Sequence, residues 1–365
     1  MRVLVTGHQG YIGSILVPLL LEEHHEVIGL DNGLFRDCAY TAPDKSTSQI
    51  RIIKKDIRDI EDDDLAGVQA IIHLAGVSFN LPDDMRARLL HEINYVAAVK
   101  LASLAKFSGV RRFIYLSSYD GTPGIERIEH IEELLGANPL YLERYISRFV
   151  ELDVSRLADS SFCPIYLRTG DVYGYSPRMR LDLPLNQIVA SIALNGGAYV
   201  SAVGDRFRPG VHVRDVSSAI ATLLRLPQHL VSRKAFGLGD AERDMSTHEL
   251  ESILKDALPP STLMFVESDD PDSTRAHFHE MELIPGFNTN WSVTEGVEQL
   301  YEAYSTVEIT RDDINTDRFS RLGHVTRLLA DGRIDANLRS LDSGAFRRPT
   351  PTPSYMQKSN TSRIG

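Results

Sequence analysis

Short apolar runs alternate with longer amphipathic stretches through the first two-thirds of the chain. The runs that suit buried strands are Arg2–Thr6, Val27–Leu30, Ile50–Lys54, Ala70–Leu74, Phe113–Leu116 and Ile165–Arg168. Most are followed by a loop and then by a stretch with helical spacing, such as Ile12–Leu21 or Met85–Lys106. This alternation predicts an α/β fold in which a doubly wound parallel sheet carries helices on both faces. Ligands of such sheets bind outside the carboxyl ends of the strands.

The pattern loosens after about Asp171, where proline, glycine and arginine become frequent. We therefore expect a nucleotide-binding domain over residues 1–170, completed by parts of 211–240. A smaller, mostly helical substrate lobe would take 171–210 and 241–342. Residues 343–365 are rich in Pro, Ser and Thr and poor in apolar side chains, which predicts a flexible tail.

Charge and cysteine usage narrow the class of partner and the compartment. The net charge of -11 argues against broad contact with nucleic acid or an anionic membrane. No apolar run reaches the roughly 18 residues of a membrane-spanning helix. The two cysteines, Cys38 and Cys163, form neither a metal-binding spacing nor a disulfide framework, so a cytoplasmic protein is expected. No metal site is predicted, because the His277-x-His279-Glu280 cluster lacks a further ligand, and such a cluster is more often a run of solvent-exposed polar residues.

Three glycines between the first strand and the first helix suggest a dinucleotide site. Gly7, Gly10 and Gly13 allow a tight turn, a close approach of the backbone to a pyrophosphate and close packing of the helix on the sheet. Asp31 ends the next strand, where its carboxylate would accept hydrogen bonds from ribose hydroxyls and repel a 2′-phosphate. NAD is therefore favoured over NADP as the cofactor of this Rossmann-type fold, although the nearby Arg36 keeps NADP open.

The spacing of these residues resembles the TGxxGxxG motif of the extended short-chain dehydrogenase/reductase family, and further marks of that family follow in order over about residues 1–340. By this resemblance the residues that contact the cofactor are Gly7, Gln9, Gly10, Tyr11, Ile12, Gly13, Asp31, Asn32, Asp56, Ile57, Leu74, Ala75, Gly76 and Asn94. The runs LRTGDVYG and RPGVHVRDV resemble two later motifs of the family. Together they point to the nucleotide-sugar epimerases and dehydratases within it.

The resemblance implies a reaction in which a hydride moves between a sugar and bound NAD. In that family a Tyr acts as acid and base, a Lys four residues later lowers its pKa, and a Ser or Thr binds the same oxygen. A phenol with a pKa near 10 is a poor base at neutral pH unless a nearby cation favours its ionised form. Lys at position i+4 is suitable because it shares a helix face with the Tyr.

The expected pair is missing from this chain. Ser118 takes the serine position, but no Tyr is followed four residues later by Lys. Tyr145 with Arg148 is the favoured substitute, because Ser147-Arg148 follows Tyr145 as Ser-Lys follows the family tyrosine. Tyr141 with Arg144 is the other possibility, and both tyrosines could instead be packing residues of a helix over about Asn138–Leu157. Arg stays charged, yet its broad fork is a poor geometric copy of an ammonium group.

Asp120 occupies the second of two acidic positions that follow the serine in the family's 4,6-dehydratases, so it is a candidate acid or base. A turn-capping role in the sequence Asp120-Gly121-Thr122-Pro123 is the competing explanation.

The substrate would be a nucleotide-sugar held by arginines of the second lobe. Arg178, Arg180 and Arg208 lie in its loops, and guanidinium groups match phosphate oxygens two at a time. Asp171 stands where many members have Asn, and a carboxylate there would repel a diphosphate.

Two other functions stay open. One is a cofactor-binding protein that has lost redox chemistry, and the other is an NAD(P)H-dependent reductase of a small carbonyl compound. A homodimer is expected from the resemblance.

Overall fold

The computed structural model describes residues 1–40, 50–78, 81, 83–118, 139–202, 206–207, 210–238, 245–267, 282–306 and 319–341. Of these, residues 83–84, 139–144, 206 and 267 are described by their backbone alone. The predicted Asp120, Arg208 and the tail over 343–365 lie outside these ranges.

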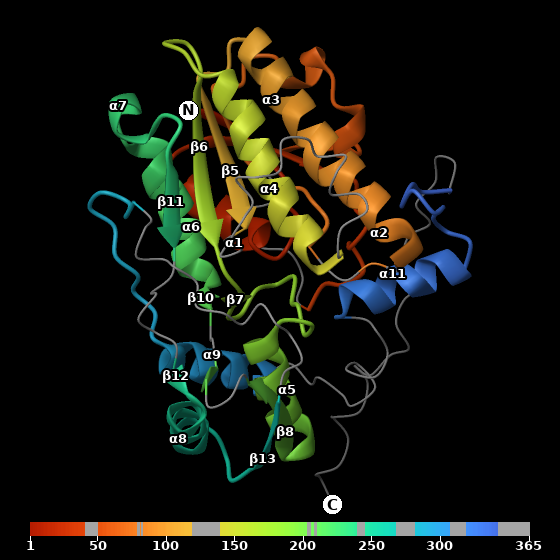
Figure 1. Cartoon of the computed structure of the whole chain (residues 1–365), viewed down its shortest axis with the longest axis vertical. Coiled ribbons are helices and arrows are strands. Elements are labelled where there is room, and N and C mark those ends of the chain that lie inside the picture. The colour runs from red at the N-terminus through yellow and green to blue at the C-terminus, as the bar shows by residue number, and fades with distance from the viewer. Residues whose placement is uncertain are drawn as a thin grey trace, which may run out of the picture.

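A seven-stranded parallel sheet forms the centre of the larger half of the molecule (Figure 1). Its strands are β1 (Arg2–Thr6), β2 (Glu26–Asp31), β3 (Arg51–Lys54), β4 (Ala70–His73), β5 (Arg112–Ser118), β6 (Cys163–Thr169) and β11 (Ala235–Leu238), in the spatial order β11-β6-β5-β4-β1-β2-β3. The chain runs outward from β1 to β3 and then crosses back to β4. The order therefore reverses beside β1, which is where a doubly wound sheet forms a crevice for ligands.

Alternating side chains of each central strand enter two hydrophobic clusters, one on each face of the sheet. In β1, Val3 and Val5 join one cluster, whereas Leu4 joins the other, and all three are fully buried. This is the period of two that a strand imposes, and burial on both faces explains why the strand reads as a continuous apolar run. The predicted doubly wound α/β fold is confirmed.

Helices cover both faces of the sheet. On one face lie α1 (Gly13–Glu22) and α6 (Val213–Arg225), which contact each other. On the other, nearer the viewer in Figure 1, lie α2 (Asp83–Leu89), a π-helical segment (Leu90–Val96), α3 (Ala97–Phe107) and α4 (Pro139–Arg156). The stretch that the sequence predicts as one helix over Met85–Lys106 is thus continuous, with a π-helical middle.

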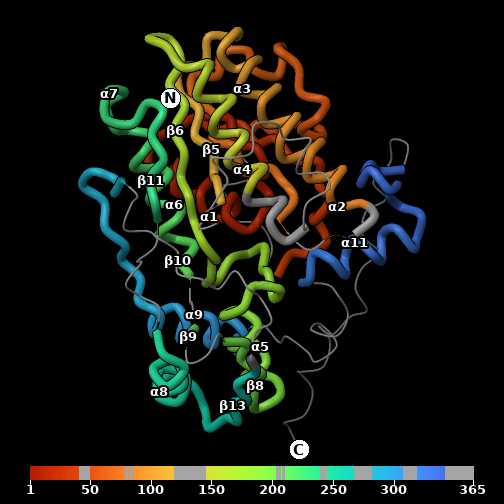
Figure 2. The backbone as a smooth tube through the Cα atoms, in the orientation of Figure 1, coloured from red at the N-terminus to blue at the C-terminus, as the bar shows by residue number. Residues whose placement is uncertain are grey.

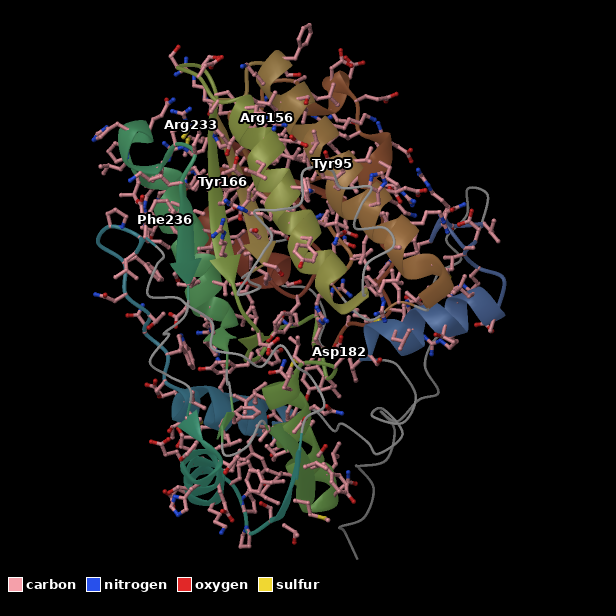
Figure 3. The ribbon with its side chains drawn as sticks, in the orientation of Figure 1. Tyr95, Arg156, Tyr166, Asp182, Arg233 and Phe236 are labelled. Atoms are coloured by element: carbon pink, nitrogen blue, oxygen red, sulfur yellow. The ribbon has the colours of Figure 1, made fainter. Side chains whose placement is uncertain are left out.

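Hydrogen bonds fix α4 to its neighbours. The Tyr95 hydroxyl of the π-helical segment donates to Asp153 at 2.5 Å. Ser155 of α4 and Tyr166 of β6 are joined by their hydroxyls at 2.8 Å. Figure 3 labels both tyrosines, which lie on either side of α4. The face of α4 that meets the sheet is therefore set by side chains from two other elements.

The smaller half lies below the sheet in Figure 1 and is largely helical. Its elements are β7 (Val172–Tyr173), α5 (Pro184–Asn195), β8 (Gly197–Ala202), β9 (Arg206–Phe207), β10 (Val211–His212), β12 (Met245–Ser246), α8 (Thr247–Ala257), β13 (Thr262–Glu267) and α9 (Val293–Thr306). Here α9 packs against α5 and α8, and β8 pairs with β13. A short helix, α7 (Gln228–Val231), leads instead into β11 of the main sheet.

One segment departs from the expected division of the chain. The sequence places residues 241–342 in the substrate lobe, yet α11 (Arg321–Ala330) lies beside α2 and the sheet half, as the tube in Figure 2 shows. Val325, Leu328, Ile334 and Leu338 join the same hydrophobic cluster as α3 and α4. Residues 319–341 therefore pack on the dinucleotide half of the molecule.

Candidate active site

A cavity of about 570 Å³ opens at the carboxyl edge of the sheet. Its walls come from the loops after β1, β2, β3, β4 and β6, from the end of β5, from α4, from the loop after β7 and from the segment 319–341. The predicted cofactor residues on these walls are Gly7, Gly10, Tyr11, Ile12, Gly13, Asp31, Asn32, Asp56, Ile57, Leu74, Ala75, Gly76 and Asn94. Gln9 is not among the wall residues, although it shapes the loop through its backbone.

The glycine turn is built for backbone contact with an anion. Gly7 has a φ of +72°, and its N–H donates to the Leu30 carbonyl at 2.8 Å, which ties the turn to β2. A Cβ on Gly13 would lie 2.4 Å from the Gly7 oxygen, so no other residue fits there. The N-cap of α1, Ile12, has no polar side chain, so it does not itself take the place of a phosphate at this helix terminus.

Two backbone N–H groups fix the Asp31 carboxylate at the end of β2. The carboxylate accepts hydrogen bonds from the Gln9 N–H at 3.2 Å and from the Gly33 N–H at 2.8 Å. These bonds link the glycine turn to the residue predicted to receive the ribose. Arg36, the residue that kept NADP open, is exposed, and its side chain is not among those that line the cavity.

Asp56 and Ile57 form the wall at the far end of the cavity, beyond β3. Arg58 binds the Asp56 carboxylate through Nε and Nη2, both at 2.9 Å. Burial acts to raise the pKa of Asp56, but the hydrogen bonds and charge of Arg58 outweigh it and leave the pKa below its ordinary value. Asp56 therefore stays ionised as a fixed acceptor.

The loop after β4 forms the floor of the cavity. Asn94 holds it from the π-helical segment, because its side-chain amide accepts from the Val77 N–H and donates to the Val77 carbonyl, each at 2.8 Å. His73 is buried beneath, with Nδ1 2.7 Å from the Thr6 hydroxyl. Burial lowers the pKa of His73 to about 4, so the ring is neutral and serves structure at neutral pH.

The inner end of the cavity is lined by hydroxyl groups, which come from Ser117, Ser118 and Ser147 together with Thr169. Ser118 thus stands where the sequence predicts it, at the end of β5. Ser117 donates to the buried carboxylate of Glu151 at 2.7 Å. Ser147 is the described side chain of α4 that reaches the wall.

Tyr145 and Arg148, the predicted catalytic pair, do not line the cavity. Tyr145 is half-buried and packs against the hydrophobic cluster shared with α3. Arg148 binds Glu151 at 2.9 Å, and Arg168 of β6 binds the same carboxylate through Nε at 2.8 Å. The structure therefore brings Ser118 and Ser147 together at the cavity and places Arg148 in an ion-pair network behind Ser117.

The predicted phosphate-binding arginines differ in position. Arg180 lines the cavity, and its Nη1 donates to the Ser78 hydroxyl at 2.9 Å while its other nitrogens bind Asp182. Asp182 is labelled in Figure 3 between the two halves of the molecule. Arg178 is buried, donates to the Arg36 carbonyl at 2.5 Å and is not among the wall residues. Asp171 also lines the cavity.

Several wall residues have no counterpart in the sequence-based set. Arg321 and Leu338 are the most distant in sequence from the other wall residues. They follow α9, the last helix of the smaller half, and line the dinucleotide end of the cavity. No spacing in the sequence signals this contact, because more than 280 residues separate Arg321 from Asp31. Ser147 does carry a sequence signal, because it directly precedes Arg148 in the stretch where the missing Tyr-Lys pair is expected.

Comparison with known proteins gives the family. The sequence profile of the NAD-dependent epimerase/dehydratase family matches residues 3–239. The chain belongs to this family. It is therefore an enzyme of an NAD-dependent family, and the predictions of the family and of NAD as the cofactor are confirmed.

Relatives within the epimerase/dehydratase family are distant. The chain is 27% identical over 271 residues to the UDP-glucose 4-epimerase of Mycolicibacterium smegmatis, which covers 62% of this chain and 84% of that protein. The Thermus thermophilus UDP-glucose 4-epimerase solved with NAD has a TM-score of 0.59 at 22% identity, over 84% of this chain and 99% of that one. An NAD-dependent NDP-hexosamine 5,6-dehydratase of tunicamycin biosynthesis has a TM-score of 0.61 at 19% identity, over 84% and 98%. At these identities the two structures show the fold.

None of the helices in the described ranges is long and apolar enough to cross a bilayer. Within the same ranges, no three His, Cys, Asp or Glu residues gather in a way that could hold a metal ion.

Proposed function

We propose that this protein epimerises or dehydrates a nucleotide-activated sugar through a transient keto-sugar, with NAD retained between turnovers. The observation that carries this proposal is the continuity of the cavity. It extends from the glycine turn, past Ser118, to Arg180 and Asp171 of the second half. A dinucleotide and a second polar ligand can thus meet at the hydroxyl-lined end. The relatives and structural neighbours include enzymes of UDP-glucose and of an NDP-hexosamine.

The chain's own groups fit the cofactor. The uncapped start of α1 and the close packing at Gly13 suit a pyrophosphate, and Asp31 suits the ribose hydroxyls. Asp56 and Ile57 form the predicted adenine contact, with Asn94 holding the floor. When bound, NAD supplies a reversible hydride acceptor beside the sugar carbon.

The proton chemistry is proposed to take place at the hydroxyl-lined end. Ser118 would bind the sugar oxygen that becomes a carbonyl. The sequence predicts that Tyr145, assisted by Arg148, is the acid/base. It predicts that Asp120 is the acid or base for elimination of water. The position of Ser147 adds a competitor, because residues four apart share a helix face and Glu143 precedes Ser147 by four. Position 143 would then carry the base, one helical turn before Ser147.

A carboxylate at position 143 would give a different base from the family's phenol. Carboxylates with an ordinary pKa near 4.3 are ionised at neutral pH and need no neighbouring cation to become basic. The absence of a Lys four residues later would then follow from the change of base. The arginines Arg180 and Arg208 remain the proposed ligands of the substrate diphosphate, whereas Arg178 is buried and donates to the Arg36 carbonyl.

The proposal is tested in two steps. First, purified protein is denatured and the released nucleotides are identified by chromatography and mass spectrometry. Near-stoichiometric NAD with a nucleotide-sugar is expected and would supply the substrate. Second, Ser118→Ala, Glu143→Gln and Tyr145→Phe are assayed on that substrate. Glu143→Gln should lower kcat at least about hundredfold if position 143 is the base. An equal loss in Tyr145→Phe alone would restore the assignment made from the sequence.

A second candidate function is a binding protein without redox chemistry. It is favoured by Arg148, whose guanidinium is committed to Glu151, and by Tyr145, which is not on the cavity wall. Detection of a keto-sugar trapped with borohydride during turnover would exclude it.

We further propose a cytoplasmic homodimer. Val96, Phe107 and Leu152 are exposed apolar residues on the π-helical segment, α3 and α4, a face suited to helix pairing between two copies. Both cysteines are buried and unbonded, as in a reducing compartment. Light scattering on the purified protein would show a monomer mass if the pairing is absent.

A further inference from the structure

Residues 319–341 reach the cofactor cavity from outside the part of the chain that matches the family. The family match ends at residue 239. Beyond it, α11 lies against the loop that follows β2. The His324 Nε2 is 2.9 Å from the Leu34 carbonyl oxygen, and the Arg321 guanidinium carbon lies 4.4 Å from the centre of the Phe35 ring. Leu34, Phe35 and Arg321 all line the cavity.

Arg321 has an unused hydrogen-bonding group in a buried position. Its residue is only 4% exposed, and its Nη1 atom has no hydrogen-bond partner within the described part of the chain. A buried guanidinium N–H without an acceptor is costly, so such a group usually has a ligand. Arg321 contacts Phe35 in the loop that follows Asp31, the residue predicted to receive the adenosine ribose. A phosphate on that side of the cavity is therefore the matching acceptor.

Leu338 forms a second contact between this segment and the cavity. It is 3% exposed and lines the wall together with Ile57 and Asn94, at the end predicted for the adenine. Its φ is 57°, a left-handed conformation that a branched apolar residue rarely adopts. Strained backbone of this kind persists only where the surroundings enforce it and is concentrated at ligand-binding positions.

Hydrogen bonds around Asp335 hold Leu338 in its left-handed conformation. The Asp335 carboxylate accepts hydrogen bonds from the N–H groups of Asn337 and Arg339, each at 2.8 Å, and its carbonyl accepts from Leu338 at 2.9 Å. This closes a tight hairpin with Leu338 near its tip.

The hairpin is also anchored to the wall of the cavity. Arg58, which binds Asp56, donates through Nη2 to the Asn337 carbonyl at 2.8 Å. Arg88 of α2 donates to the Ala336 carbonyl at 2.9 Å, and Arg339 forms an ion pair with Asp59. The hairpin and the predicted adenine contact are thus held by the same arginine.

We propose that residues 319–341 form a second cofactor-binding element that closes over the adenosine half of NAD, with Leu338 against the adenine and Arg321 at the adenosine-side phosphate. An apolar face suits a flat base, and Ile57 provides another at the same end. The element explains how NAD can be retained between turnovers. It rests on the cofactor cavity and is independent of the sugar chemistry.

The test measures binding to the full chain freed of nucleotide. Calorimetric titrations use NAD, AMP and nicotinamide mononucleotide as probes. Leu338→Gly and Arg321→Met are each expected to raise Kd for NAD and AMP about tenfold, the loss of one good contact, and to leave nicotinamide mononucleotide unchanged. Release of bound NAD, followed by chase, should quicken by a similar factor. Leu338→Gly should leave the segment folded, since glycine adopts a φ of 57° without strain.

Matched controls lie in the same segment. Arg327 is an exposed arginine of α11, and Leu341 is 57% exposed at the end of the hairpin. Arg327→Met and Leu341→Gly should change Kd less than twofold, and thermal unfolding without ligand reports folding of all four variants. Unchanged AMP affinity in both test variants would overturn the proposal and leave a structural role. Tighter AMP binding by Leu338→Gly would also overturn it, because Leu338 would then occupy the place of the adenine. An equal loss for nicotinamide mononucleotide would show a general disturbance and reject the assignment to the adenosine half.

Discussion

The two ends of the cavity differ in how their side chains are fixed. At the dinucleotide end, Asp31 and Asp56 line the wall and are held by neighbours within two residues or by the adjoining glycine turn. At the inner end, Ser118 and Ser147 line the wall, while the charged groups Arg148, Glu151 and Arg168 form a network behind it.

This difference indicates which parts of the site tolerate amino-acid substitution. Binding of the dinucleotide relies on backbone geometry, which tolerates few substitutions at the glycines. The inner end relies on which face of α4 meets the cavity, and a shift of one residue exchanges the whole set of side chains on that face. The reactive residues could therefore be replaced without disturbing the cofactor end.

The largest expected effect is on the network at the inner end. Glu151→Leu removes a carboxylate that is 3% exposed and that binds two guanidinium groups and Ser117. We expect it to lower the free energy of unfolding by about 3 kcal/mol, because breaking a buried ion pair leaves its charge poorly compensated. Urea denaturation monitored by circular dichroism measures this. A loss below about 1 kcal/mol would mean that the network does not hold α4 in place.

The next effect addresses the dinucleotide end. Gly13→Ala would place a Cβ 2.4 Å from the Gly7 oxygen and 2.7 Å from the His8 Cα, both of them backbone atoms. We expect NAD affinity to fall about hundredfold, since the turn must open and displace the phosphate site.

Gly109→Ala is the control for this substitution. Gly109 has open space around its Cα and a φ of +78°, so the change adds local strain away from the cavity. It should cost stability and leave NAD affinity unchanged by calorimetry. Equal losses of affinity in both variants would mean that the effect at Gly13 is not local.

The pH dependence of the free energy of unfolding tests the burial of His73 beneath the floor of the cavity. Burial holds the pKa of His73 near 4, below its ordinary value of 6.5, so the unfolded chain takes up the proton first as pH falls. The stability from His73 is present above pH 6.5 and is lost as pH falls from 6.5 toward 4. Between pH 7 and pH 5 this loss should be about 2 kcal/mol.

His73→Gln should reduce the pH dependence by that amount. Part of the dependence will remain, because burial also lowers the pKa of His212 to about 4. Denaturant titrations of both proteins at pH 7 and pH 5 supply the comparison. Identical slopes with pH in the two proteins would show that His73 is not buried as a neutral ring.

The smallest effect concerns Arg148. Its side chain is 38% exposed, so its ion pair with Glu151 is partly screened by water. Arg148→Met should lower the free energy of unfolding by less than about 1 kcal/mol and leave NAD affinity as it was. A shift in the pH profile of kcat in this variant would instead show that Arg148 acts on the reacting groups, and the contrast between the two ends would weaken.

Much of the fold and of the cofactor end could be predicted from the sequence. Each predicted strand overlaps a strand of the sheet. The more central strands are buried on both faces and read as continuous apolar runs, whereas the edge strand β3 is largely exposed and is marked by its two isoleucines alone. The predicted wall residues from Gly7 to Asn94 follow strand ends in the order of the chain. The middle of the long helix after β4 could not be predicted as π-helical, because hydrophobic spacing does not separate it from α-helix.

The sequence by itself determined the properties that depend on nearby residues. The glycine spacing, the acid at the end of β2 and the strand–helix alternation all act within one or two turns of chain, so they identified the family, the fold and NAD. Only the tertiary structure decided which face of α4 meets the cavity, because bonds from Asp153, Ser155 and Glu151 to other elements set that face. It alone brought Arg321 and Leu338 to the adenosine end, since contacts between residues so far apart follow from packing and leave no periodic signal.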